Sequence, residues 1–186
     1  MASTTWKIDP AHTTVEFAVK HMMFTTVRGR FKSLDGTIDV DEQDPANSRV
    51  NVEFDASSID TGVANRDAHL RSADFLDTQT FPTLTFRTTS VEGAHAKAGD
   101  RFTVKGELTI HGTTVPVTLD ATFEGIGKDP WGNQRAGFAA RTEIDRRDWN
   151  LKWNQALETG GILVGNAVKI EIEAQAVKQE RQQAAA

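Results

Sequence analysis

Residues 101–123 read RFTVKGELTIHGTTVPVTLDATF, and this stretch decides the fold. Apolar residues or glycine occupy every second position from Phe102 to Ile110, and apolar residues do so again from Val115 to Phe123. Successive side chains of a strand point to opposite faces, so the alternation predicts two strands with one apolar face each. His111-Gly112 lies between them, and a short link that contains glycine is typical of a β-hairpin.

The same period of two recurs along most of the chain, in eight long runs altogether. The other runs cover residues 14–20, 27–40, 49–56, 83–91, 135–145 and 166–177. Within 27–40 the apolar positions change from odd to even numbers after Phe31, as happens when a β-bulge inserts one extra residue. Long strands with one apolar face and internal glycines predict an all-β fold, a closed antiparallel barrel of eight strands. A sandwich of two sheets is the alternative that alternation leaves open.

One segment between the strand-like runs does not alternate. In residues 59–82, Thr61 is a suitable N-cap for a short helix that ends near Leu70. Ser72 is placed to begin a second, single turn. We therefore expect a short helical insertion at about residues 61–76.

Length and composition exclude several classes of protein. The chain has 186 residues and a net charge of −5, and this mild acidity argues against a nucleic-acid-binding surface. It has no cysteine, so disulfides, thiolate nucleophiles and zinc ribbons are excluded. We predict one barrel domain over residues 1–178 and a polar C-terminal tail over residues 179–186.

Signals for membranes, export, metals and catalysis are missing from the sequence. No apolar run approaches the roughly 18 residues of a membrane span, so we expect no transmembrane segment. The first residues lack a basic segment followed by an apolar one, so we expect no signal peptide and a cytoplasmic location. None of the five histidines forms a chelating pair, and there is no Gly-x-Ser-x-Gly elbow. We expect neither a metal site nor catalytic residues.

The inside of the predicted barrel is apolar, and one polar segment stands out beside it. A barrel of about eight strands is either filled by its own side chains or just wide enough for one small ligand. In the segment 65–71, NRDAHLR, helical spacing puts Arg66 and His69 on one face. These residues form either a cationic rim for an anionic or polar headgroup, or a solvated helix held by an Asp67–Arg71 pair.

Several short motifs occur in a fixed order along the chain. They are WKIDPAH (6–12), FAVKH (17–21), VRGRF (27–31), SIDT (58–61), RDAHLRSADF (66–75), FPTLTF (81–86), GELTIHG (106–112) and IDR (144–146). From about Trp6 to Ala176 the chain thereby resembles the YceI-like family of bacterial polyisoprenoid-binding proteins. The resemblance implies an extended lipocalin-like barrel that holds a long isoprenoid or similar lipid, often as a homodimer, without covalent chemistry and without a cofactor.

One departure from the family pattern concerns a turn near the end of the chain. Where relatives commonly carry Phe-Gly, this chain has Trp149-Asn150. Asparagine tolerates a left-handed backbone better than most residues, so we expect the turn to remain. The bulkier Trp149 is expected to narrow the tunnel.

Residues and resemblance together predict a protein that binds, stores or transports a long-chain isoprenoid, such as a polyprenyl diphosphate or a quinone, and is not an enzyme. The residues expected along the lipid tail are Phe17, Val19, Phe31, Phe54, Leu70, Phe75, Phe86, Val104, Leu108, Leu119 and Phe138. The residues expected at the headgroup are Arg66, His69 and Arg71. The alternatives are an isoprenoid isomerase or cyclase that uses His69 or Asp67 as acid or base, and a stress or interaction module whose barrel is filled.

Overall fold

The structure is a computed structural model that describes residues 3–95 and 97–180. Its strands are β1 (Ser3–Ile8), β2 (Thr14–His21), β3 (Thr25–Phe31), β4 (Leu34–Asp41), β5 (Arg49–Asp55), β6 (Ile59–Asp60), β7 (Thr83–Glu92), β8 (Arg101–Ile110), β9 (Thr113–Lys128), β10 (Gln134–Asp145) and β11 (Val164–Lys178). Its helices are α1 (Ala64–Arg71) and the short 3-10 turns η1 (Pro10–His12), η2 (Pro45–Asn47), η3 (Ala56–Ser58) and η4 (Arg146–Trp149).

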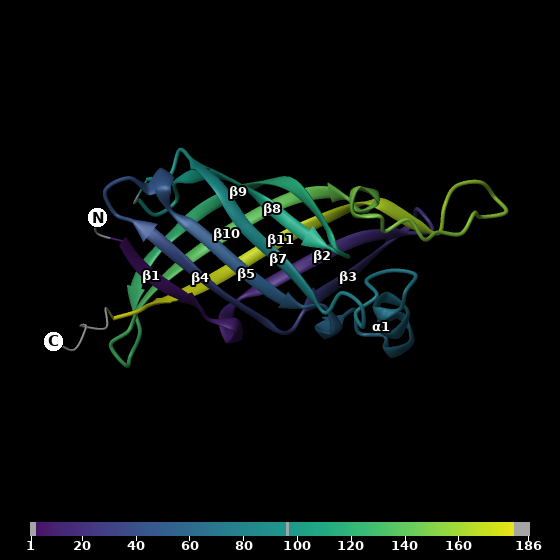
Figure 1. Cartoon of the computed structure of the whole chain (residues 1–186), viewed down its shortest axis with the longest axis horizontal. Coiled ribbons are helices and arrows are strands. Elements are labelled where there is room, and N and C mark those ends of the chain that lie inside the picture. Colours follow the sequence, from purple (N-terminus) through teal and green to yellow (C-terminus); the bar gives the residue numbers. More distant parts are fainter. Residues whose placement is uncertain (1–2, 96, 181–186) are drawn as a thin grey trace.

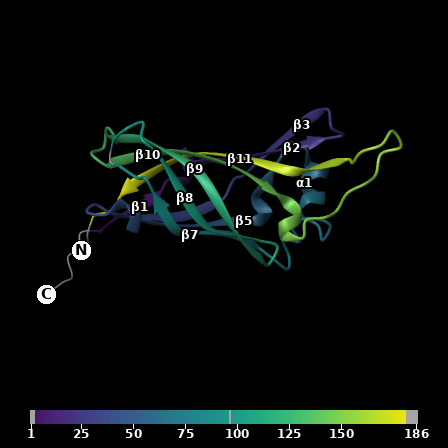
Figure 2. The same ribbon diagram turned by 90° about the horizontal axis from the view of Figure 1, so that it is seen from above.

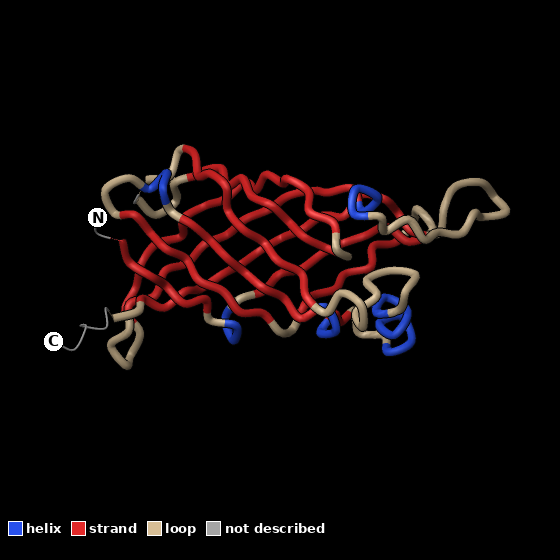
Figure 3. The backbone as a smooth tube through the Cα atoms, viewed as in Figure 1, coloured by secondary structure: helices blue, strands red, loops and turns tan. Residues whose placement is uncertain are grey.

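The strands form one closed antiparallel barrel (Figures 1 and 3). β1, β4, β5, β7, β8, β9, β10 and β11 are hydrogen-bonded in that order, and β1 also pairs with β11, which closes a ring of eight strands. β2, β3 and β6 continue the sheet from the other half of β11. The predicted fold, an eight-stranded all-β barrel with one short helix, is confirmed for the part of the chain that the structure describes.

Three of the long strands are interrupted, so the structure has more strand segments than the sequence predicts. β11 pairs with β1 at residues 176–178 and with β2 at residues 164–173, so β1 and β2 are consecutive parts of one strand separated by η1. β3 and β4 have the same relation, because β3 pairs with β2 and β4 pairs with β1. β5 and β6 are likewise separated by η3.

The change of parity in residues 27–40 is real, but its cause differs from the predicted β-bulge. β3 ends at Phe31 and β4 begins at Leu34. The backbone between them bonds outside the sheet ladder: Ser33 N donates to Ser58 Oγ at 3.1 Å, and Ser33 O accepts from Asp55 N at 3.0 Å. A break of two residues re-aims the side chains as one extra residue would, and both halves face the same interior.

The predicted hairpin is present at the end of β8. Ile110 pairs with Thr113, and the two residues between them, His111 and Gly112, have φ angles of 52° and 71°. Two-residue turns with positive φ match the right-handed twist of paired strands, which is why a glycine here favours the hairpin.

The helix is shorter than the predicted insertion, and its start is held differently. α1 covers Ala64–Arg71, its N-cap is Val63, and residues 72–76 form turns rather than a second helix. Thr61 is not the cap. Its N and Oγ1 donate to Asp67 Oδ1, so Asp67 is committed to Thr61 and does not pair with Arg71.

The two ends of the barrel differ in what covers them. In Figures 1 and 2 the chain termini lie at one end, and α1 lies at the other together with the β2–β3 turn and the 150–163 loop. We call these the terminus end and the helix end. Each end has its own cluster of buried apolar side chains, one containing Trp149 and Ile59, the other Trp6 and Phe123.

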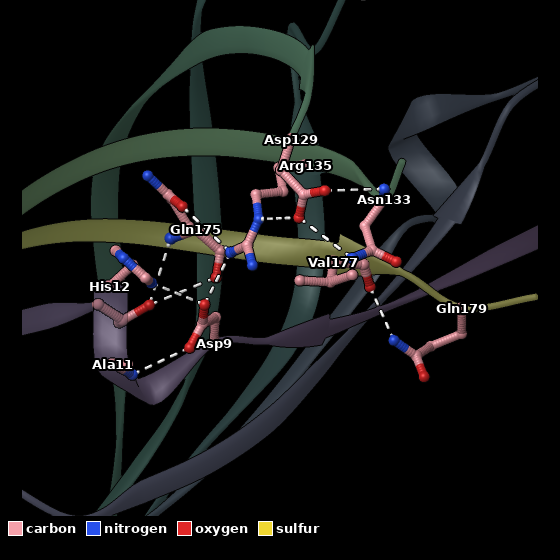
Figure 4. A network of polar contacts seen from close by, with 10 residues as sticks. Asp9, Ala11, His12, Asp129, Asn133, Arg135, Gln175, Val177 and Gln179 are labelled. Carbon is pink, nitrogen blue, oxygen red and sulfur yellow. Dashed lines mark hydrogen bonds and ion pairs between the residues drawn. The ribbon is translucent and has the colours of Figure 1, made fainter. Parts of the chain in front are cut away.

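A polar network near the terminus end joins three parts of the barrel (Figure 4). The Arg135 guanidinium on β10 donates to Asp9 Oδ2 at 2.7 Å and to Asp129 Oδ2 at 2.9 Å. It also donates to Gln175 Oε1 on β11, and His12 Nδ1 lies 2.8 Å from Asp9 Oδ2. The hydrogen bond from Arg135 lowers the pKa of Asp129 from 3.8 to about 2 and also lowers the pKa of Asp9.

Because of this network, the stability of the fold depends on pH in the acidic range. Because the folded-state pKa of Asp129 lies below its ordinary value, its carboxylate stabilises the fold fully above about pH 4 and loses that effect as the pH falls through about 2. We expect Asp129→Asn to lower the melting temperature at neutral pH, and the difference from the wild type to shrink as acid is added. Thermal melts across this pH range test it.

Glu171→Gln, on an exposed face of β11, serves as the control and should keep the wild-type pH profile. An Asp129→Asn difference that stays constant down to pH 2 would contradict the assignment.

Candidate functional site

A cavity of about 910 Å³ lies inside the barrel. The alternate, inward positions of the strands line it, so its wall is apolar over most of its length. All eleven residues predicted along the lipid tail are part of the lining: Phe17, Val19, Phe31, Phe54, Leu70, Phe75, Phe86, Val104, Leu108, Leu119 and Phe138. A cavity of this size is inconsistent with the alternative of a barrel filled by its own side chains.

Aromatic rings lie along the cavity wall instead of filling its centre. The rings of Phe17, Phe31 and Phe54, on three neighbouring long strands, are 6.0 and 5.9 Å apart from centroid to centroid. Phe17 faces Gly29 across the β2–β3 pair, and a Cβ on Gly29 would collide with the Phe17 ring. This glycine therefore lets an aromatic ring lie flat against the neighbouring strand.

The same arrangement recurs on the opposite wall. A Cβ on Gly106 of β8 would lie 2.5 Å from Phe86 Cζ of β7. At the terminus end the rings of Phe123 and Phe138 are 5.5 Å apart and belong to paired positions of β9 and β10. Ring and glycine pairs thus keep large side chains at the wall and leave open space along the middle.

Arg146 is the buried charged residue of the cavity, and sequence reasoning did not single it out as a site residue. Its side chain donates to four backbone carbonyls: Gly165 O at 2.9 Å, Leu151 O at 2.6 Å, Trp153 O at 2.9 Å and Val164 O at 3.3 Å. Burial lowers the pKa of Arg146 below the ordinary value of an arginine. The motif IDR contained this residue, but its burial depends on carbonyls of the 150–163 loop and of the start of β11, which no local spacing reveals.

Trp149 fixes the wall beside Arg146. It is 1% exposed, and its indole Nε1 donates to Leu108 O of β8 at 2.9 Å. Asn150 has a φ of 60°, so the expected left-handed turn is present. Trp149 lines the cavity, and its indole occupies space at the helix end.

Two of the three predicted headgroup residues reach the cavity. Arg66 and His69 of α1 line it. Arg71 does not belong to the lining among the described residues, and its guanidinium donates to Ser57 O at 3.4 Å. Arg66 is held by Thr61, donating to Oγ1 at 2.7 Å and to the carbonyl at 2.9 Å.

His69 belongs to an aromatic group at the helix end. Its ring lies 5.1 Å from the Phe75 ring and 4.7 Å from the Trp153 ring, both edge to face. Its Nε2 lies 2.8 Å from Asp74 Oδ2. The contact with Trp153 connects α1 to the 150–163 loop, which Arg146 holds from the other side.

Charge is unevenly distributed between the two ends of the cavity. Within the described ranges, the carboxylates of the lining are Asp41 and Glu42, both at the terminus end. Of the lining lysines and arginines, Lys20, Arg66 and Arg146 lie at the helix end, and Lys178 lies at the terminus end, 3.9 Å from Glu42. The helix end of the cavity is therefore the end that suits a negatively charged or electron-rich group.

The described residues contain neither a metal-binding cluster nor a membrane-spanning helix. Over residues 3–95 and 97–180, no three His, Asp or Glu side chains are grouped so that they could hold a metal ion. No helix in the same part of the chain is long and apolar enough to cross a membrane.

A closed barrel of eight antiparallel strands around an apolar cavity defines the class of lipocalin-like barrels that enclose a small ligand. The model of the YceI-like domain matches residues 6–176. The chain therefore belongs to the YceI-like family.

Protein YceI of Escherichia coli O157:H7 is 46% identical over 149 residues, which are 79% of this chain and 76% of that protein. Protein YceI of Salmonella newport is 45% identical over 148 residues, 78% of this chain and 75% of that protein.

Solved structures share the fold. The YCEI protein of Campylobacter jejuni aligns with a TM-score of 0.71 and 27% identity, covering 87% of this chain and 90% of that chain. Burkholderia cenocepacia BcnA aligns with a TM-score of 0.75 at 23% identity, over 90% and 98% of the two chains. A polyisoprenoid binding domain from Saccharophagus degradans aligns with a TM-score of 0.71 at 15% identity, over 94% and 98%. At these last two identities the likeness shows the fold alone.

Arg146 should be the residue on which the helix end depends for stability. Arg146→Met removes the donors of four carbonyls, and we expect a loss of about 3 kcal/mol in the free energy of unfolding. Arg147→Met is the matched control, because this neighbour is exposed and its ion pair with Asp145 at 2.6 Å is screened by solvent, so we expect a much smaller loss. Urea unfolding measures both, and equal losses would contradict the structural role of Arg146.

Proposed function

We propose that this protein is a non-enzymatic carrier or store for a long-chain isoprenoid or a similar amphiphilic lipid. The observation that carries the proposal is the cavity of about 910 Å³ with its apolar wall. Cavities that hold small molecules have volumes of about 300–1,000 Å³. The volume of this cavity falls within that range and is far larger than that of a packing defect. The tail of the guest lies along the barrel, and its polar end lies at the helix end.

Affinity comes from burial of the tail. Each methylene transferred from water to an apolar environment contributes about 0.8 kcal/mol, before the cost of ordering a flexible chain is subtracted. Branched aliphatic and aromatic side chains line the cavity, a surface that suits methyl-branched hydrocarbon. A polyprenyl diphosphate and a quinone both combine such a tail with an oxygen-rich end. The name of the Saccharophagus degradans domain, a polyisoprenoid binding domain of the same fold, supports this class of guest.

The headgroup is assigned to the helix end on electrostatic grounds. Arg66 and His69 line the cavity there, and no carboxylate of the described lining lies at that end. The guanidinium of Arg66 is already oriented by its two bonds to Thr61, so less side-chain freedom is lost on binding. Asp41 and Glu42 make the opposite end unfavourable for a phosphate.

The alternative of an isoprenoid isomerase or cyclase needs an acid or base beside the guest. Asp67 is 7% exposed, bonds to Thr61 and is absent from the described lining of the cavity, which disfavours it. His69 lines the cavity but packs between two rings and pairs with Asp74. A turnover assay on prenyl diphosphates, with His69→Ala as the control, separates the two functions: turnover that depends on His69 would replace the carrier with an enzyme.

The direct test of the proposed function is extraction. The protein is purified natively, extracted with organic solvent, and the extract is analysed by mass spectrometry. A stoichiometric isoprenoid lipid supports the carrier function and names the class of guest. An empty extract from folded protein, followed by failure to bind added prenyl lipid, would overturn it.

Phe86 is the residue to change in the middle of the wall. Phe86→Arg places a charge in the apolar cavity, and burying an unpaired charge is strongly unfavourable, so we expect lipid retention to fall below detection. Thr89→Arg is the matched control, since Thr89 lies on the same strand and is exposed. Mass spectrometry of extracts from both folded variants tests the site, and full retention by Phe86→Arg would contradict it.

The headgroup assignment predicts a difference between two arginines of the same helix. Arg66→Ala should weaken binding of a prenyl diphosphate about tenfold, the scale of one lost charge-assisted contact. Arg71→Ala should leave it unchanged, because Arg71 lies outside the described lining. Binding of the uncharged prenyl alcohol should be the same in both variants. Fluorescence titrations of the wild type and both variants with each ligand measure these affinities. Equal effects of Arg66→Ala and Arg71→Ala on binding of the diphosphate would contradict the assignment.

A further inference from the structure

The β2–β3 turn exposes a group of large apolar side chains. Met22, Met23 and Phe24 are 39%, 66% and 81% exposed, and together we call them the hairpin tip. Figures 1 and 2 place the β2–β3 hairpin and the 150–163 loop at the helix end, opposite the chain termini. Three consecutive apolar side chains in water are unfavourable for a soluble surface, and such groups mark interaction sites.

The backbone conformation of the hairpin tip is also unfavourable for the residues that it contains. Met22 and Met23 have φ angles of 50° and 64°, in the left-handed region that favours glycine and asparagine. Phe24 N nevertheless donates to His21 O at 3.1 Å, so the turn is a defined one. Asn-Gly would satisfy the same turn without strain or exposed apolar surface. The geometry of the turn therefore gives no reason for methionine at these two positions.

The hairpin tip is held against the rim of the cavity. Met22 N donates to Leu163 O at 2.8 Å, and a Cβ on Gly161 would lie 2.6 Å from Met23 Sδ. His21 and Leu163, which flank the tip, both line the cavity. The apolar side chains thus lie beside the helix end of the cavity, where the headgroup is proposed to lie.

Charge favours an anionic partner at this end. From Val19 to Arg28 the chain contains Lys20, His21 and Arg28 and no carboxylate, although the whole chain has a net charge of −5. Arg28 pairs with Glu16 at 3.3 Å. At the terminus end, residues 39–44 contain four carboxylates and no lysine or arginine. The exposed apolar side chains of the hairpin tip are thus flanked along the chain by Lys20, His21 and Arg28 and by no carboxylate.

We propose that the hairpin tip inserts into the surface of a bilayer that contains anionic phospholipids. Insertion of Met23 and Phe24 at the level of the headgroups would bury their exposed surface, and Lys20 would face lipid phosphates. The helix end of the barrel then faces the bilayer, and a guest that enters or leaves at this end passes between membrane and barrel without crossing water. This partner is independent of the identity of the guest.

Vesicle flotation tests the proposal. The probes are vesicles of phosphatidylcholine alone and of equal parts phosphatidylcholine and phosphatidylglycerol, both free of isoprenoid, so that failure of the proposed function does not affect the result. We expect the wild type to float with the anionic vesicles and less with the neutral ones. Phe24→Ser should reduce the bound fraction about tenfold. Trp131→Ser is the matched control, because Trp131 is 82% exposed at the terminus end, and it should float like the wild type.

A second variant separates membrane binding from folding. Met22→Asn combined with Met23→Gly gives the turn its preferred residues, so its melting temperature should equal or exceed that of the wild type while flotation decreases. The proposal is overturned if the wild type does not float with anionic vesicles, or if Trp131→Ser loses as much binding as Phe24→Ser. It is also overturned if sedimentation shows a wild-type dimer that Phe24→Ser dissociates and vesicles do not bind. The tip would then be an interface between two copies.

Discussion

The structure depends on β11 having a partner along both of its edges. It pairs with β10 at eleven consecutive positions, and its other edge is shared by β1 and β2. An unpaired edge of this length would expose a row of backbone donors and acceptors, and closing the barrel removes that edge. Closure also brings together the residues that Arg135 contacts, because Asp9 follows β1 and Gln175 is on β11, and these two strands pair to close the barrel. The network connects the two strands that complete the ring.

Closure alone would allow a filled interior, and the hollow one has a local cause. The large rings that face inward lie against strands that carry glycine, as Phe17 does beside Gly29 and Phe86 beside Gly106. A ring beside a glycine can approach the neighbouring strand more closely than a Cβ would allow. Glycine weakens a strand because it has no side chain to pack and is conformationally free. Here the long hydrogen-bonded ladders on both sides of these strands compensate for that loss. The cavity is thus built from the pairing of rings with glycines, and not from small side chains alone.

The sequence could predict this barrel because alternation of period two is local information. Residues 101–123 alone define two strands, their shared turn and their inner face, and the structure agrees on all three. The eleven predicted wall residues reach the cavity for the same reason: once the inner face is known, its apolar members must line whatever space remains. The family resemblance added the expectation of a guest, which periodicity does not contain.

What sequence reasoning missed depends on contacts between segments that are distant or irregular. Thr61 is a residue type that commonly caps helices, but its backbone N donates to the Asp67 side chain, and Val63 occupies the N-cap position. Arg71 has the right spacing for the rim, yet its backbone position turns it toward Ser57. Arg146 was part of a quoted motif, and its burial follows from carbonyls on a loop without periodicity. Helical spacing gives faces, and only the tertiary fold says which face meets the cavity.

The two ends of the cavity are secured by different kinds of contact, and this difference has a consequence for how a guest would enter. At the terminus end, continuous strand pairing between β1, β4 and β11 continues to the ends of the strands. At the helix end, the 150–163 loop is attached through the side chains of Arg146 and Asn154 and through the backbone bond from Met22 N to Leu163 O, while the bridge between Ala156 and Ile162 lies within the loop. Local opening of a loop breaks far fewer ladder hydrogen bonds than opening a strand pair. The 150–163 loop therefore opens at lower cost than the paired strands. It lies at the end with the cationic lining and the exposed hairpin tip, so access through this loop would put entry of the guest, recognition of its headgroup and contact with a bilayer on one side of the molecule.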